Sequence, residues 1–135
     1  EEEIKLLQQS ETIPVILPGA QFFLQLPMPP ARTMIDAGLA LAIASDYNPG
    51  SSPSANMAFN VSIACIQYKL NINEALNAAT LNGAAAMNLA HEVGSIAVGK
   101  KANFQITVPL PSADLIPYHF AHLLTHAVFI NGNKI

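Results

Sequence analysis

The segment from Gly38 to Pro53, GLALAIASDYNPGSSP, constrains the fold more than any other part of the chain. Residues Leu39 to Ser45 form a near-continuous run of small and branched apolar side chains, which is typical of a parallel strand covered on both faces. The run ends at Asp46, and a polar turn, Asn48 to Ser51, follows. Ligands of α/β folds bind beyond the carboxyl ends of such strands. We therefore expect Asp46 and the turn to lie at the functional edge of a parallel sheet.

The same turn also has a purely structural interpretation. Pro49 presets φ at one central position of the turn, and Gly50 accepts a positive φ at the next position. Asn-Pro-Gly-Ser therefore predicts a good turn whether or not a ligand binds there. The two interpretations are compatible, because a well-built turn can also carry functional groups.

The residues before this strand predict a right-handed βαβ unit. Thr12 to Pro18 is a short apolar run with β-branched residues and predicts a strand, and residues 20–30, rich in aromatic and Pro residues, predict a loop. Ala31 to Ala37 predicts a helix that Gly38 ends as its C-terminal cap. The order of strand, loop, helix and strand is that of a βαβ unit. Residues 1–10 predict a further helix ahead of it.

Helical patterns continue after the turn. Residues 54–69 have apolar positions at helical spacing, with Ser54 or Asn56 as the N-cap. Asn71 and Glu74 form a capping-box-like pattern at the start of the next helix. We expect Asn82 to cap a further Ala-rich helix that ends at Leu89.

The last third of the chain predicts a small β appendage. Residues 103–108 alternate like a strand, residues 109–117 are irregular, and residues 127–130 predict a second strand. The pair Asn131-Gly132 then predicts a hairpin turn into the final residues.

The composition limits the kinds of partner and the cellular compartment that we expect for this chain. The chain is 51% hydrophobic and 11% charged, so we expect surfaces that other protein covers, as in a homo-oligomer such as a dimer. The net charge of −3 and the scattered Lys and Arg residues make nucleic acid an unsuitable partner. No apolar run approaches the roughly 18 residues of a membrane span, so we expect no membrane partner. The single Cys65 predicts no disulfide framework and fits a reducing, cytoplasmic compartment.

Three stretches together resemble the C-terminal third of the amidohydrolase superfamily. They are AIASDYNPGSSP, a final barrel strand with its turn; NINEALNAATLNGAAAMNL, similar to a helix pair; and GSIAVGKKANFQI with VFINGNKI, similar to closing β segments. The resemblance covers residues 13–135. It implies an α/β fold, namely a C-terminal fragment of a (β/α)8 amidohydrolase barrel with its last two βα units in residues 1–90. Part of a small β-sandwich domain would occupy residues 91–135.

The resemblance also implies a reaction and roles for residues. LPGAQFFL followed by SDYNPGSSP looks most like the member that opens the ring amide of 4-imidazolone-5-propanoate, a small-molecule substrate, to N-formimino-L-glutamate in histidine degradation. By this resemblance Asp46 matches a catalytic, proton-handling residue that is also a metal ligand. Asn48, Gly50 and Ser51 match the turn that contacts the substrate. The implied cofactor is Zn or Fe, which would lower the pKa of a bound water.

The chain departs from the superfamily pattern in its histidines. The His-x-His pair and the further His of earlier barrel strands have no counterpart, since the histidines here are His91, His119, His122 and His126. We interpret the last three as ordinary loop and surface residues. The first residue, Glu1, and two strands that cannot close a barrel favour a fragment. Because the metal-ligand histidines have no counterpart, we expect this fragment to be inactive by itself. The alternatives are another cyclic-amide hydrolase or deaminase of the superfamily, or a non-catalytic chain that self-associates through an apolar sheet edge.

Overall fold

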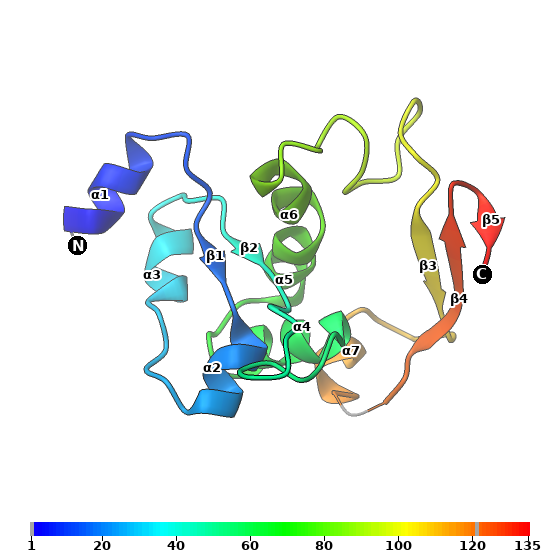
Figure 1. The fold of residues 1–135 in the computed structure, drawn as a ribbon, viewed down its shortest axis with the longest axis horizontal. Coiled ribbons are helices and arrows are strands. Elements are labelled where there is room, and N and C mark those ends of the chain that lie inside the picture. The colour runs from blue at the N-terminus through cyan, green and yellow to red at the C-terminus, as the bar shows by residue number, and fades with distance from the viewer. Residues whose placement is uncertain (1, 121) are drawn as a thin grey trace.

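The computed structural model describes residues 2–120 and 122–135, so Glu1 of the first predicted helix lies outside the described residues (Figure 1). Helices surround a small parallel sheet in the N-terminal two thirds, and an antiparallel sheet at the opposite end of the molecule contains the C-terminus. In chain order the elements are α1 (Glu2–Gln8), β1 (Val15–Ile16), α2 (Pro18–Leu24), α3 (Ala31–Asp36), β2 (Ala42–Ile43), α4 (Met57–Ile66), α5 (Ile72–Ala79), α6 (Leu81–Ala86), β3 (Phe104–Thr107), α7 (Leu115–Tyr118), β4 (Thr125–Ile130) and β5 (Asn133–Lys134).

Strands β1 and β2 pair in parallel, as predicted from the strand, helix, strand order. Val15 lies opposite Ala42 and Ile16 opposite Ile43. The ladder continues on both sides of these pairs, because Ala42 donates its N–H to the Pro14 carbonyl at 2.9 Å and Ala44 donates to Ile16 at 3.1 Å. The paired segment is shorter than the predicted strand at residues 39–45, because the chain enters α2 directly after β1.

Helix α2 corrects the prediction of a loop at residues 20–30. Pro18 stands in the first turn, where its fixed φ favours a helix start, and the helix continues to Leu24. It ends at Gln25, which adopts a left-handed φ of 54°. The loop prediction is correct only for the Pro-rich residues after it.

Helix α3 ends as the sequence predicts. Gly38 has a φ of +84° and donates its N–H to the Ile35 carbonyl at 2.8 Å, and Leu39 donates to Met34 at 3.0 Å. This is the hydrogen-bond pattern of a Schellman-type helix end, in which Gly tolerates the left-handed conformation. The turn directs the chain from α3 straight into β2.

The helices that follow the turn at Asn48 to Ser51 begin at the predicted caps, with one exception. The Asn56 side chain accepts from the Phe59 N–H at the start of α4, and Asn71 and Glu74 form a complete capping box on α5. Asn82 does not cap α6, because α6 follows α5 after Thr80 alone and Asn82 lies inside it. Its side chain instead donates to the Leu41 carbonyl at 2.8 Å, next to β2.

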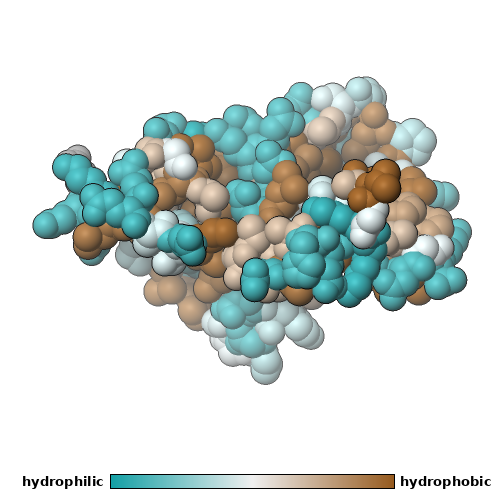
Figure 2. Space-filling view, turned by 90° about the horizontal axis from the view of Figure 1, so that it is seen from above, coloured by the Kyte–Doolittle hydropathy of each residue, from teal (hydrophilic) through white to brown (hydrophobic). Residues whose placement is uncertain are grey.

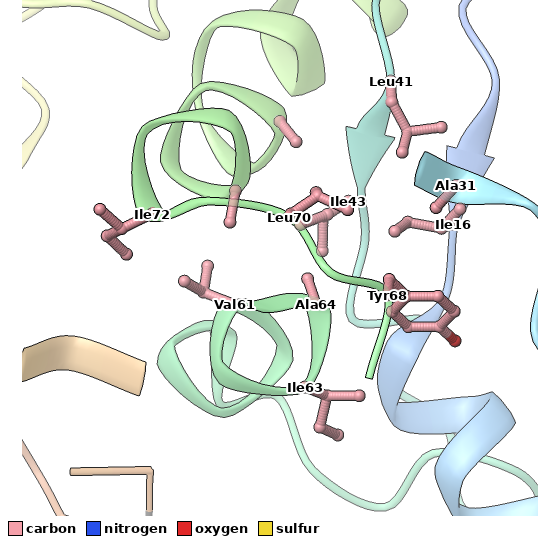
Figure 3. Close-up of a cluster of buried hydrophobic side chains, with 12 residues drawn as sticks. Ile16, Ala31, Leu41, Ile43, Val61, Ile63, Ala64, Tyr68, Leu70 and Ile72 are labelled. Atoms are coloured by element: carbon pink, nitrogen blue, oxygen red, sulfur yellow. The ribbon is translucent and has the colours of Figure 1, made fainter. Parts of the chain in front are cut away.

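The core lies between the parallel sheet and helices α3, α4 and α5 (Figure 3). The strands contribute Ile16 and Ile43, and Leu41 lies directly before β2; each of the three is at most 4% exposed. Burial of each such side chain contributes about 1.5–3 kcal/mol, so the core holds β2 against the helices. The buried members of this cluster are Ile16, Ala31, Leu41, Ile43, Val61, Ile63, Ala64, Tyr68, Leu70, Ile72, Ala75 and Ala78.

The C-terminal sheet has the order β3-β4-β5 and is antiparallel. Phe104 and Phe129 pair across β3 and β4 with stacked rings 4.7 Å apart between centroids. Asn131 and Gly132 both have positive φ, of 49° and 81°, which confirms the predicted hairpin. The predicted irregular segment at residues 109–117 instead contains the start of α7, which packs on α4.

The surface carries apolar areas among the polar ones (Figure 2). Phe22, Phe23, Leu24, Leu26 and Met28, in and just after α2, are each about half exposed, at 46–54%. Clustered apolar surface of this kind is typical of a face that other protein covers. Among the described residues, no helix is both long and apolar enough to span a membrane.

Candidate functional site

Asp46 lies just beyond the carboxyl end of β2, where the sequence predicts it. Its side chain is exposed, and its backbone has a φ of +49°, a left-handed conformation that Asp and Asn tolerate better than most residues. Asp46 and Ser51 line a cavity of about 350 Å³ together with residues of β1, α2 and α3. The remaining residues lining it are Pro14, Val15, Ile16, Leu17, Ala20, Gln21, Leu24, Leu26, Pro29 and Met34.

The side chain of Asn48 organises the turn after Asp46. Its Oδ1 accepts the N–H of Gly50 at 2.9 Å and the N–H of Ser51 at 2.8 Å. Its Nδ2 donates to the Asp46 carbonyl at 2.6 Å and to the Ser51 hydroxyl at 2.8 Å. These bonds satisfy most of the capacity of the carboxamide within the turn. The Asn-Pro-Gly-Ser sequence therefore forms an ordered turn, as predicted, but Gly50 does not have the predicted positive φ. The hydrogen bonds of the Asn48 side chain hold the turn instead, and a role in substrate binding remains a prediction.

Ser52 directly follows the turn and is buried against the rest of the protein. Its backbone pairs with Asn48, with N–H to carbonyl distances of 3.0 and 3.3 Å in the two directions. Its hydroxyl donates to the Ser45 carbonyl at 2.6 Å, and the residue is only 2% exposed. The turn is thus attached to the end of β2 at both its start and its end.

A larger cavity, of about 800 Å³, lies between β2, α6 and the segment leading into β3. It is lined mainly by apolar and small side chains, among them Ala42, Ala44, Met57 and Met87, and Asp46 is not among its residues. Size alone would favour it as a ligand site. We assign the candidate site to the smaller cavity, because only that one contains an ionisable group at a strand end.

The described residues contain no group of three or more His, Cys, Asp or Glu side chains arranged to hold a metal ion. His119 and His122 lie near each other, with ring centroids 5.1 Å apart, but His126 belongs to β4. His91 is exposed and lies 3.4 Å from the Glu92 carboxylate. Among the described residues, Asp46 therefore belongs to no group of three or more side chains that could hold a metal ion.

Sequence reasoning missed the buried polar residues behind the turn, Ser52 and Asn60. Both are at most 2% exposed. One signal was available, since Asn60 interrupts the apolar segment MAFNVSIACI at a position that faces the protein interior. A buried Asn needs hydrogen-bond partners, and this requirement could have marked it as a structural polar contact.

The sequence profile of the Amidohydrolase family matches residues 3–135. The chain belongs to the amidohydrolase family. This match confirms the superfamily resemblance carried by the Asp46 turn, the helix pair and the closing strands.

Curated amidohydrolases with the name imidazolonepropionase are similar to it over its whole length. The protein from Flavobacterium johnsoniae is 53% identical over 134 residues, covering 99% of this chain and 33% of that protein. The protein from Christiangramia forsetii is 50% identical over 135 residues, covering 100% of this chain and 33% of that protein. The chain thus spans about a third of the length of the curated relatives it matches. The finer resemblance seen in LPGAQFFL and SDYNPGSSP is confirmed.

Solved amidohydrolase structures share the fold of this chain. An adenosine deaminase from Xanthomonas campestris, solved with bound zinc, superposes with a TM-score of 0.86 at 27% identity, covering 98% of this chain and 34% of that one. A mutant atrazine chlorohydrolase from Arthrobacter aurescens, complexed with zinc and atraton, gives a TM-score of 0.83 at 17% identity, covering 98% and 33%. The mixed α/β arrangement is therefore that of amidohydrolase-superfamily enzymes.

Proposed function

We propose that the full-length protein is an imidazolonepropionase, which hydrolyses the ring amide of 4-imidazolone-5-propanoate to N-formimino-L-glutamate. The observation that carries this proposal is the 53% identity to a curated imidazolonepropionase across 99% of the chain. The position of Asp46 supports it, because the carboxylate lies at a strand end beside a cavity. The same reaction would place the protein in histidine degradation and in the cytoplasm.

Asp46 is the proposed proton carrier of the reaction. Hydrolysis adds the oxygen of one water to the ring carbonyl carbon and breaks the bond from that carbon to the ring nitrogen. The ionised Asp46 carboxylate would take a proton from the attacking water and deliver it to the departing nitrogen. Its exposure and its place at the cavity support this role, since a proton carrier must reach both water and substrate.

The described residues do not by themselves fit the metal centre that the family implies, because they contain no cluster of three or more ligand side chains. Asp46 would supply one ligand to Zn or Fe, and side chains outside this chain would supply the others. A bound ion of this kind lowers the pKa of a coordinated water and polarises a carbonyl. The zinc-bound structure of the related deaminase supports a metal in the complete enzyme.

The turn at Asn48, Gly50 and Ser51 is the proposed substrate contact. Ser51 lines the same cavity as Asp46, and Asn48 fixes the N–H groups of Gly50 and Ser51. A turn that is already rigid loses little conformational entropy when a ligand binds to it. Asn48 would therefore act on the substrate mainly by holding the shape of the turn.

The complete architecture is also a proposal. Residues 1–90 would form the last two βα units of a (β/α)8 barrel, and residues 91–135 would form part of a small β-sandwich domain. The parallel pairing of β1 with β2 and the separate antiparallel sheet support this division. The exposed apolar residues of α2 support association into a dimer.

The test is an assay of the purified full-length protein with 4-imidazolone-5-propanoate, with N-formimino-L-glutamate measured by mass spectrometry. We expect this product, and no comparable turnover of adenosine or guanine, which serve as control substrates for the deaminase alternative. Absence of the product, or faster turnover of a control substrate, would assign the protein another reaction.

A further inference from the structure

Asn60 of α4 is completely buried, at 0% exposed, in an otherwise apolar segment. Its Oδ1 accepts the backbone N–H of Gly19 at 2.8 Å, and its Nδ2 donates to the Asn56 carbonyl at 3.0 Å. The first N–H groups of a helix lack partners within the helix, and Leu17 offers α2 no side-chain cap. Asn60 therefore joins the start of α2 to α4 through a buried hydrogen bond.

Gly19 allows two polar side chains to approach the start of α2. A Cβ at this position would lie 3.0 Å from Asn60 Oδ1 and 3.1 Å from Ser52 Oγ. Both distances are shorter than ordinary contacts to a Cβ, so any side chain here would displace Asn60 or Ser52. The absence of a side chain at Gly19 therefore lets Ser52 pack close to the start of α2.

Ser52 and Asn48 fix the two peptide groups that flank Asp46. The Ser52 hydroxyl donates at 2.6 Å to the Ser45 carbonyl, which belongs to the peptide before Asp46. The Asn48 Nδ2 donates at 2.6 Å to the Asp46 carbonyl, which belongs to the peptide after it. A left-handed φ at a residue other than Gly costs about 1–3 kcal/mol and persists only when its surroundings hold it. These two bonds hold Asp46 in that conformation.

We propose that Ser52, supported by Gly19 and Asn60, is a positioning residue for the Asp46 carboxylate. This inference rests on the proposed function, in which Asp46 moves the proton. A catalytic group displaced by about 1 Å can cost roughly a hundredfold in rate. Ser52 acts on the reaction only through the backbone of Asp46, because its hydroxyl faces Ser45 and the protein interior.

The test compares Ser52→Ala with Ser62→Ala in the full-length protein. Ser62 is a matched control, because it is 1% exposed and donates its hydroxyl to the Ala58 carbonyl at 2.8 Å, away from the turn. We expect Ser52→Ala to lower kcat by roughly ten- to a hundredfold and to change KM by less than about threefold. Ser62→Ala should keep kcat within about twofold of the wild-type value, even if its Tm falls as much as the Tm of Ser52→Ala. Equal kcat values in the two variants would overturn the positioning role.

A second pair of variants tests the same contact without removing the Ser52 hydroxyl. Gly19→Ala introduces the close Cβ contacts, whereas at Gly83 of α6 a Cβ would meet nothing nearer than the Ala78 carbonyl at 3.5 Å. We expect Gly19→Ala to lower kcat and Gly83→Ala to leave it unchanged. Unchanged kcat in Gly19→Ala would contradict the proposal.

Amide hydrogen exchange separates this inference from the proposed function. If the wild-type protein does not hydrolyse 4-imidazolone-5-propanoate, the proposed function fails, and exchange over residues 45–52 still measures the positioning. We expect faster exchange there in Ser52→Ala than in Ser62→Ala. Equal exchange in the two variants would show that Ser52 does not hold the backbone around Asp46.

Discussion

The guanidinium of Arg32 makes a two-pronged hydrogen bond to the carboxylate of Glu74, with Nη1 to Oε2 at 2.8 Å and Nη2 to Oε1 at 3.0 Å. Arg32 lies on α3, and Glu74 belongs to the capping box of α5. The pair therefore connects α3, the second of the two helices between the parallel strands, to the start of α5, which packs on β2. Bidentate pairs of this kind are more specific in geometry than single ion contacts.

This pair predicts a pH-dependent contribution to stability. The hydrogen bond from Arg32 holds the pKa of the Glu74 carboxyl below its usual value of 4.5. A carboxyl whose pKa is lowered by folding stabilises the protein above its unfolded-state pKa, and this stabilisation is lost as the pH falls through the lowered value. We expect Glu74→Gln to lower the Tm at pH 7 and to have a much smaller effect at pH 3, as measured by calorimetry.

Glu92→Gln is the control for that measurement. Glu92 pairs with Lys101, which also lowers the pKa of this carboxyl, but the Lys101 side chain is 53% exposed. Exposed pairs contribute little to stability. The Tm of Glu92→Gln should therefore change less than that of Glu74→Gln. If Glu74→Gln lowered the Tm equally at pH 7 and at pH 3, the stabilisation would not come from the charge of the Glu74 carboxylate.

Asp46→Asn should remove most of the activity of the full-length protein and leave its fold intact. The amide cannot ionise to accept a proton, and loss of general acid–base catalysis typically costs about 10²- to 10⁴-fold in rate. Asn tolerates the left-handed φ of +49° as well as Asp does, so the backbone need not change. Kinetic assays and circular dichroism measure the two effects. Asp36→Asn, on the exposed side of α3, is the control. Near wild-type turnover of Asp46→Asn would reduce Asp46 to a turn residue.

Asn48→Ala should weaken the reaction through the turn. Loss of a partly buried hydrogen bond of the turn costs up to about 1–3 kcal/mol, which predicts a fall in kcat/KM of roughly fivefold to 150-fold. Asn48→Asp keeps an acceptor for the N–H groups of Gly50 and Ser51 and should lose less. Metal content should not change in either variant. Unchanged kinetics, or loss of metal, would contradict a substrate-binding role for the turn.

Replacement of His119, His122 and His126 together by Gln should leave the metal content of the full-length protein unchanged. The ring pair of His119 and His122 lacks a nearby carboxylate or Cys that would complete a site among the described residues. Elemental analysis by mass spectrometry measures the bound metal. A lower metal content than in the wild-type protein would identify these residues as ligands.

The 135-residue chain purified by itself should show no measurable ring hydrolysis. A catalytic zinc site usually has three protein ligands, and Asp46 provides one carboxylate. The comparison is the full-length protein at the same concentration and with the same added zinc. Stoichiometric zinc binding together with turnover by the short chain would contradict this expectation.

Local sequence patterns predicted the helix ends and turns of the fold, because contacts between neighbouring residues determine them. The Gly38 helix end, the capping box of Asn71 with Glu74 and the hairpin at Asn131 each depend on residues within a few positions of one another. The errors have the same basis. Helix α2 was missed because residues 20–30 were interpreted as one loop from their aromatic and Pro residues, although the Pro residues follow the helix and Pro18 favours a helix start. Asn82 resembles a cap but bonds to Leu41, which is distant in the sequence.

By itself, the sequence determined the parallel strand that precedes Asp46, the turn that follows Asp46 and the amidohydrolase resemblance, because all three are patterns of neighbouring residues. Only the tertiary structure decided that Gly19 bonds to Asn60, across 41 residues, and that Arg32 bonds to Glu74, across 42 residues. Such contacts depend on how the core packs the helices against β1 and β2, and a single residue in the sequence carries no mark of its distant partner. The chemistry of the site is therefore readable from the strand and turn, whereas the backbone conformation of Asp46 depends on packing.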